Sequence, residues 1–159
     1  LRRFAPAKVD FFRLSSLIMG KTKDERKVPM SMSISSRNSA PRYRRDGITS
    51  YLLASKRTGG AENIAVTLVE MDVDGFQHIH KHAPEQTYTI LEGSGLMTVN
   101  GEKRQVIPGD CIFIPSWAEH GLQNTGGSVL KYLSAASPSF TLQECIDWWP
   151  LPSLDESAS

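Results

Sequence analysis

Turn-forming residues recur at short intervals between residues 46 and 138, and this spacing limits the possible fold more than any other feature. The apolar segments between the turns are only four to eight residues long, which is typical of strands rather than of helices. Asn100-Gly101 predicts a two-residue hairpin turn, because both residues tolerate a positive φ. The pattern indicates an all-β fold, either an antiparallel sandwich or a barrel.

The expected organisation has three parts: a basic extension over residues 1–45, a barrel over 46–138, and a C-terminal helix and tail over 139–159. Thr141 and Glu144 have the spacing of a capping box, which predicts a short helix over Leu142–Trp149 that ends at Pro150. The strands expected in the barrel are Ile48–Ala54, Ile64–Met71, Gln77–His82, Gln86–Leu91, Gly95–Val99, Lys103–Val106, Cys111–Ile114, His120–Asn124 and Leu130–Ala135.

Charge separates the N-terminal segment from the rest of the chain. Residues 1–45 carry twelve Lys/Arg and three Asp/Glu, whereas residues 46–159 carry six and fourteen. With few apolar residues at a regular period, the basic segment should be extended or disordered, although alternation near 30–34 leaves room for an edge strand. No nucleic-acid-binding motif accompanies the charge, so we expect a basic leader and no nucleic-acid partner.

The cysteines and the apolar segments bear on the compartment. Cys111 and Cys145 are far apart and lack CxxC spacing, which suits a reducing compartment, so we expect a cytoplasmic protein. No uninterrupted apolar run approaches about 18 residues, so we expect no membrane span. Arg13 interrupts the apolar residues that a secretory signal would need, while the Arg and Ser content of residues 1–20 leaves an organellar leader open.

The histidines form the clearest cluster of chemically useful residues. Alternate side chains of a strand point to the same face, so the expected strand Gln77–His82 directs His78, His80 and His82 to one side. Gln86 and Tyr88 share one face of the following strand, and His120 comes from a distant one. Imidazoles combined with an oxygen ligand suit Fe, Mn, Ni, Cu or Zn. From these residues alone, a loose surface cluster of histidines is an equally good interpretation.

One motif around these histidines resembles the first motif of the cupin superfamily. In that family a Gly precedes HxH, three or four residues then lead to a Glu, and six more lead to a Gly. Here Gly75 precedes His80-Lys-His82, three residues lead to Gln86, and six more lead to Gly93. Gln86 therefore occupies the position of the usual Glu.

A second motif resembles the other cupin signature, which runs Gly, Pro-x-Gly, two residues, His, three residues, Asn. The corresponding residues are Gly109, Pro115, Trp117, His120 and Asn124. Trp117 replaces the usual Gly and is the only departure in this motif. The resemblance covers roughly residues 47–136.

The resemblance implies a double-stranded β-helix, the jelly-roll barrel of cupins, which commonly forms a homodimer. It makes His80, His82, Gln86 and His120 the ligands of one divalent transition metal. An alternative register takes His78, His80 and Glu85 instead, but it then needs seven residues rather than six to reach Gly93.

The same resemblance implies a metal-dependent enzyme that acts on a small organic substrate, with dioxygenases, isomerases and lyases among the reaction classes. Tyr88, two residues beyond Gln86, is the candidate catalytic residue. A non-catalytic module that binds or senses a small molecule is the alternative. The fold does not select among these reactions.

Overall fold

The computed structural model describes residues 32–148, which form nine strands and one helix. Seven-residue helix α1 follows the last strand and covers Leu142–Trp148. The strands are β1 (Arg42–Arg45), β2 (Ile48–Ala54), β3 (Ala65–Met71), β4 (Glu85–Glu92), β5 (Gly95–Val99), β6 (Glu102–Val106), β7 (Cys111–Ile114), β8 (His120–Asn124) and β9 (Leu130–Ser137).

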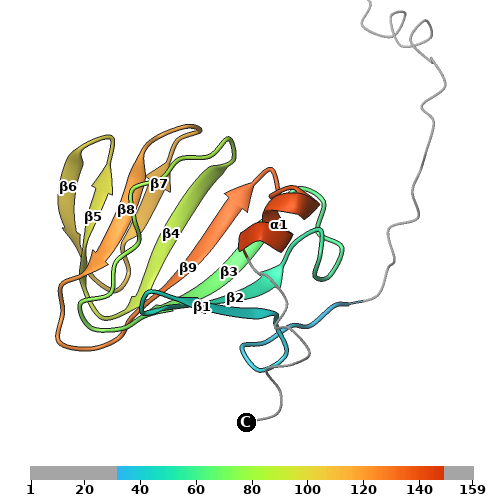
Figure 1. The fold of residues 1–159 in the computed structure, drawn as a ribbon, viewed down its shortest axis with the longest axis horizontal. Helices are drawn as coiled ribbons and strands as arrows, with labels where there is room; N and C mark the ends of the chain where they lie inside the picture. The colour runs from blue at the N-terminus through green and yellow to red at the C-terminus, as the bar shows by residue number, and fades with distance from the viewer. Residues whose placement is uncertain (1–31, 149–159) are drawn as a thin grey trace, which may run out of the picture. The chain divides into compact units, whose positions relative to one another are not determined.

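Two antiparallel sheets form the barrel (Figure 1). The larger sheet has the strand order β1-β2-β3-β9-β4-β7, and the smaller one has the order β6-β5-β8. Neighbours such as β3 and β9 are distant in sequence, which is typical of a jelly roll. The all-β, double-stranded β-helix expected from the sequence is confirmed, together with the short C-terminal helix.

The segment expected to form a strand over Gln77–His82 is an extended loop instead. It makes only isolated bridges to β8, one between Phe76 and Gln123 and one between His80 and His120. The two bridges are four residues apart on the loop but three on β8, so the register shifts between them and no continuous ladder forms. The prediction of a regular strand here was wrong, although the loop still lies along β8.

Two further differences concern the N-terminal part of the domain. The larger sheet begins at Arg42 in β1, four residues before the expected start of the barrel. Residues 32–34 form no strand, and the rest of the edge strand considered near 30–34 lies outside the described residues. Trp149, the expected last residue of the helix, also lies outside them.

The segment preceding β1 is attached to the outer face of the larger sheet. Arg37 donates two hydrogen bonds of 2.9 Å to the carboxylate of Glu70 on β3. The guanidinium also lies 5.0 Å from the centroid of the Tyr51 ring. The pKa of Glu70 is lowered, first by its hydrogen bond with Arg37. These contacts hold the segment before β1 against the sheet rather than leaving it as a free extension.

Two groups of buried side chains stabilise the domain. The first fills the barrel and consists of Val69, Met71, Tyr88, Ile90, Met97, Val106, Ile114, Ala118, Leu122, Leu130 and Tyr132. The second lies under helix α1 and consists of Leu52, Ala65, Ala136, Phe140 and Cys145. Thr141 and Glu144 cap the helix reciprocally, as their spacing predicts, with N–H···O distances of 2.7 and 3.2 Å.

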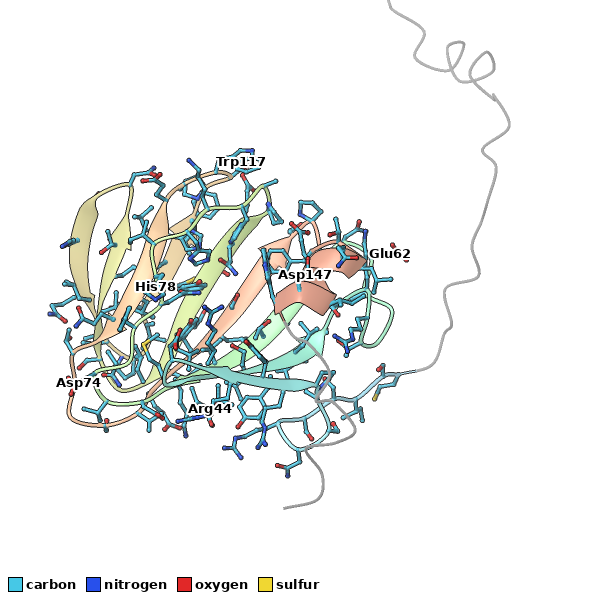
Figure 2. The ribbon with its side chains drawn as sticks, in the orientation of Figure 1. Arg44, Glu62, Asp74, His78, Trp117 and Asp147 are labelled. Atoms are coloured by element: carbon cyan, nitrogen blue, oxygen red, sulfur yellow. The ribbon has the colours of Figure 1, made fainter. Side chains whose placement is uncertain are left out.

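The turns follow the residues that favour them, with one exception. Asn100 and Gly101 adopt φ values of 46° and 83°, so the expected hairpin turn is confirmed. Trp117 also has a positive φ, 63°, in the position where the cupin motif has Gly. Its side chain is 63% exposed and lies at the end of the barrel between β7 and β8 (Figure 2). No helix among residues 32–148 has the length and apolar character needed to cross a membrane.

Candidate metal centre

Three histidines from two separate segments meet inside the barrel. His80 and His82 lie on the loop before β4, and His120 is the first residue of β8. Two backbone hydrogen bonds between His80 and His120, 3.0 and 2.9 Å long, hold the loop against the strand. As a result, the candidate ligand atoms of the three side chains all lie within 4.8 Å of one another.

Backbone carbonyls set the orientation of all three imidazole rings. The Nδ1 atom of each ring lies 2.9 Å from a carbonyl oxygen: His80 from that of His78, His82 from that of Pro84, and His120 from that of Ala118. A carbonyl can only accept, so each Nδ1 carries the proton and donates it. In the neutral rings every Nε2 therefore presents a lone pair, as a metal ligand must.

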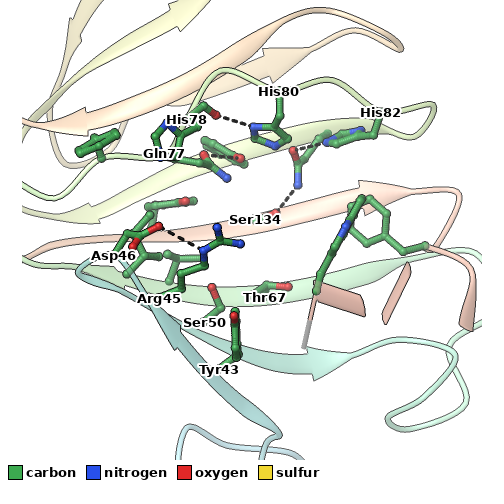
Figure 3. A pocket seen from close by; sticks show the side chains of 18 of the residues that line it. Tyr43, Arg45, Asp46, Ser50, Thr67, Gln77, His78, His80, His82 and Ser134 are labelled. Atoms are coloured by element: carbon green, nitrogen blue, oxygen red, sulfur yellow. Dashed lines mark hydrogen bonds and ion pairs between the residues drawn. The ribbon is translucent and has the colours of Figure 1, made fainter. Parts of the chain in front are cut away.

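Gln86 adds an oxygen to this group of acceptors. Its Nε2 donates to the Ser134 hydroxyl at 2.7 Å, and its Oε1 lies 3.0 Å from Nε2 of His82 (Figure 3). With a neutral imidazole and this orientation of the amide, a lone pair of His82 Nε2 and a lone pair of Gln86 Oε1 point at each other. A shared cation satisfies such an arrangement.

His120 gives an independent test of whether the site fits a metal. Its side chain is fully buried, and its Nε2 has no hydrogen-bond partner among residues 32–148. An unpaired polar atom in a buried position is costly unless a ligand satisfies it. Three imidazole nitrogens and one amide oxygen are a donor set that suits a first-row transition metal.

The electrostatic environment keeps the rings of His80 and His120 neutral. Burial, together with the neighbouring His80 and His82, lowers the pKa of His120 from 6.5 to about 4. Burial also lowers the pKa of His80. Both rings are therefore uncharged at neutral pH, which is the state that binds metal.

The two residues that only the alternative register uses, His78 and Glu85, lie outside this group. His78 is exposed and packs edge-on against the ring of Phe76, with a centroid distance of 4.7 Å. Glu85 is exposed on β4, whereas Gln86, the next residue, is buried and points into the barrel. The structure thus brings together the four residues of the first register and leaves His78 and Glu85 outside the group.

Tyr88 lies beside this group without joining it. Its ring is 6.0 Å from that of His120 and 4.6 Å from that of Tyr132. Burial raises the pKa of Tyr88 to about 12, so its hydroxyl stays protonated and donates to Oε1 of Gln77 at 3.0 Å. At neutral pH it can act as a hydrogen-bond donor but not as a base.

A cavity of about 420 Å³ leads from the solvent to the histidines. Two of its walls come from segments outside residues 46–138, the expected barrel: Tyr43 and Arg45 on β1, and Phe140 and Trp148 near the C-terminus. The Phe140 and Trp148 rings lie 5.4 and 6.3 Å from that of His82. The only sequence signal for the wall formed by β1 was that Tyr43 and Arg45 are alternate residues, which share one face of a strand.

Comparisons with known proteins agree with this geometry. Residues 67–136 match the cupin domain family. An uncharacterized protein of Methanocaldococcus jannaschii is 42% identical over 67 residues, which are 42% of this chain and 54% of that protein. Dimethylsulfoniopropionate lyase DddW of Ruegeria pomeroyi is 43% identical over 42 residues, which are 26% of this chain and 28% of the lyase. The chain thus matches about half or less of the length of these two relatives.

Solved structures show the same fold. An RmlC-like cupin from Shewanella frigidimarina superposes with a TM-score of 0.60 and 18% sequence identity, covering 69% of this chain and 93% of that one. The match of residues 67–136 to the cupin domain family and this likeness together show that the barrel has the cupin fold.

Proposed function

We propose that this cupin is a metal-dependent enzyme that acts on a small organic substrate. One observation carries the proposal: four acceptor atoms, on His80, His82, His120 and Gln86, converge at one wall of an open cavity. Among the residues that the structure describes, no proton donor is directed at Nε2 of His120. A divalent cation is the partner that this arrangement favours.

The residues around the cavity would have different roles. The three imidazoles and Gln86 would hold the ion, which when bound polarises a substrate oxygen as a Lewis acid. All four are neutral, so they would leave the charge of the ion available to the substrate. Phe140 and Trp148 would limit the access of water from one side.

Tyr88 has a positioning role in this proposal. Its raised pKa removes it as a general base at neutral pH, but its hydroxyl holds the side chain of Gln77 at the cavity wall. Loss of the hydroxyl in Tyr88→Phe should therefore weaken substrate binding more than metal binding. The partial similarity to a lyase supports an enzymatic rather than a purely structural role, because the matched proteins include one that converts a small organic molecule.

The test combines metal loading with turnover. Protein stripped by a chelator would be loaded separately with Mn, Fe, Ni, Cu or Zn and incubated with a panel of small organic acids, with mass spectrometry to detect consumption. We expect turnover with at least one metal and none with His120→Ala. Metal-loaded protein that binds panel members but converts none would support a binding or sensing module instead.

A further inference from the structure

Strand β1 directs two of its four side chains into the cavity that contains the histidines. Tyr43 and Arg45 both line it, as alternate residues of a strand should. Arg44 points the other way, where its guanidinium donates to Thr49 at 2.8 Å and to Asp72 at 2.5 Å (Figure 2). Strand β1 thus directs Arg45 into the cavity and is anchored to the sheet through Arg44.

A tight turn fixes the position of Arg45. Asp46 and Gly47, with φ values of 50° and 76°, connect β1 to β2, where Arg45 is paired with Ile48. The Nε atom of Arg45 donates to Asp46 at 3.2 Å. The two terminal nitrogens of the guanidinium have no partner among the described residues. The side chain is 73% exposed, so a ligand entering the cavity can reach it.

Gln77 lies across the cavity from Arg45 (Figure 3). Its Oε1 accepts the hydrogen bond from the Tyr88 hydroxyl at 3.0 Å. This hydrogen bond uses the oxygen of the amide. The NH₂ group of Gln77 is therefore the part that remains to meet a ligand, and it can only donate.

We propose that Arg45 and Gln77 form a subsite for a carboxylate, so that the substrate is an organic acid with a second polar group for the histidine centre. A guanidinium with two free terminal nitrogens matches the geometry of a carboxylate, and an amide NH₂ adds a third donor. Lys81 also lines the cavity, whereas Asp46 is its only carboxylate among the described residues and is already paired with Arg45. The subsite rests on the proposed function, because it assumes that the substrate reaches the histidines.

The test compares diacids with their monoamides. Malonate, succinate and glutarate, each beside its monoamide, would be titrated by calorimetry into metal-loaded wild-type protein and into Arg45→Gln. Wild type should prefer at least one diacid over its monoamide by about tenfold or more, the range expected for a charge-assisted hydrogen-bonded pair. Arg45→Gln should abolish that preference while its affinity for the metal, measured separately, stays unchanged.

Two further variants complete the design. Arg42→Gln removes the same charge from the other face of β1 and should keep the full preference for the diacid. Gln77→Glu retains an acceptor for Tyr88 but removes the NH₂ group and adds a negative charge, so it should reverse the preference. Equal diacid preference in wild type and Arg45→Gln would overturn the subsite. Failure of the wild-type protein to bind metal would instead refute the proposed function, and the two results are distinguishable.

Discussion

Acid should destabilise the metal-free protein through His120. Burial lowers the pKa of this fully buried imidazole from 6.5 to about 4. In the unfolded chain the same group titrates near its ordinary pKa, at about 6.5. Between these two pH values the unfolded state binds a proton that the folded state does not. Stability is therefore lost as the pH falls through this window, and above it the group makes no contribution.

The size of the effect follows from the two pKa values. Each pH unit within the window costs about 1.4 kcal/mol, so the loss reaches about 3 kcal/mol by pH 4. His80 acts in the same direction, because burial lowers its pKa too. For a domain whose total stability is on the order of 5–15 kcal/mol, this is a large fraction.

Urea unfolding of chelator-treated protein at pH 7 and pH 4.5 measures the effect. His120→Gln is the matched variant, because Gln is polar and does not titrate, while Glu70 and the other carboxylates titrate in both proteins. Between the two pH values the wild type should lose about 2–3 kcal/mol more than the variant. Equal losses would show that His120 is charged, or accessible to water, in the folded protein.

Three further changes test other parts of the structure. Gln86→Glu should tighten the binding of hard ions such as Mn, because it adds a negative charge to the ligand group. Glu85→Gln, at an exposed position, should leave metal affinity unchanged. Metal titrations in which Glu85→Gln has the larger effect would support the alternative register. Trp117→Gly should raise the free energy of unfolding by about 0.5–1 kcal/mol. The positive φ costs Trp about 1–2 kcal/mol, and the greater flexibility of Gly in the unfolded chain offsets part of the stability gained by relieving it. A lower melting temperature of the variant would contradict this. Glu144→Ala should cost about 1 kcal/mol by removing one of the two reciprocal capping hydrogen bonds. Glu144→Gln is the control that retains a capping side chain, and equal melting temperatures of the two variants would argue against this hydrogen bond.

The strands of the barrel were predictable because turn chemistry is local. The expected strands Ile48–Ala54, Gly95–Val99, Cys111–Ile114 and His120–Asn124 match the observed ones at both ends. The spacing of the two motifs was also sufficient to select the residues that converge. Gln86 and His120 are 34 positions apart, and only the family resemblance could connect them before the fold was known.

The cavity walls were not predictable, because they depend on tertiary contacts. Basic composition made residues 1–45 look like a free leader, but the ion pair of Arg44 with Asp72 and the turn at Asp46-Gly47 attach β1 to the sheet. The Gln77–His82 segment carries the alternation of a strand, yet it makes only bridges to β8. Its side chains do not alternate as those of a strand would, because Gln77 and Lys81 line the cavity together with the three histidines of the segment.

The proposed metal centre holds one ion between His80, His82, His120 and Gln86. X-ray absorption spectroscopy of the metal-loaded protein, recorded at the absorption edge of the bound metal, tests it most directly. We expect one ion per chain with three imidazoles in its coordination shell in the wild type, and loss of the bound ion from the His80→Ala/His82→Ala double variant. A shell without imidazole, or an unchanged spectrum in the double variant, would contradict the account.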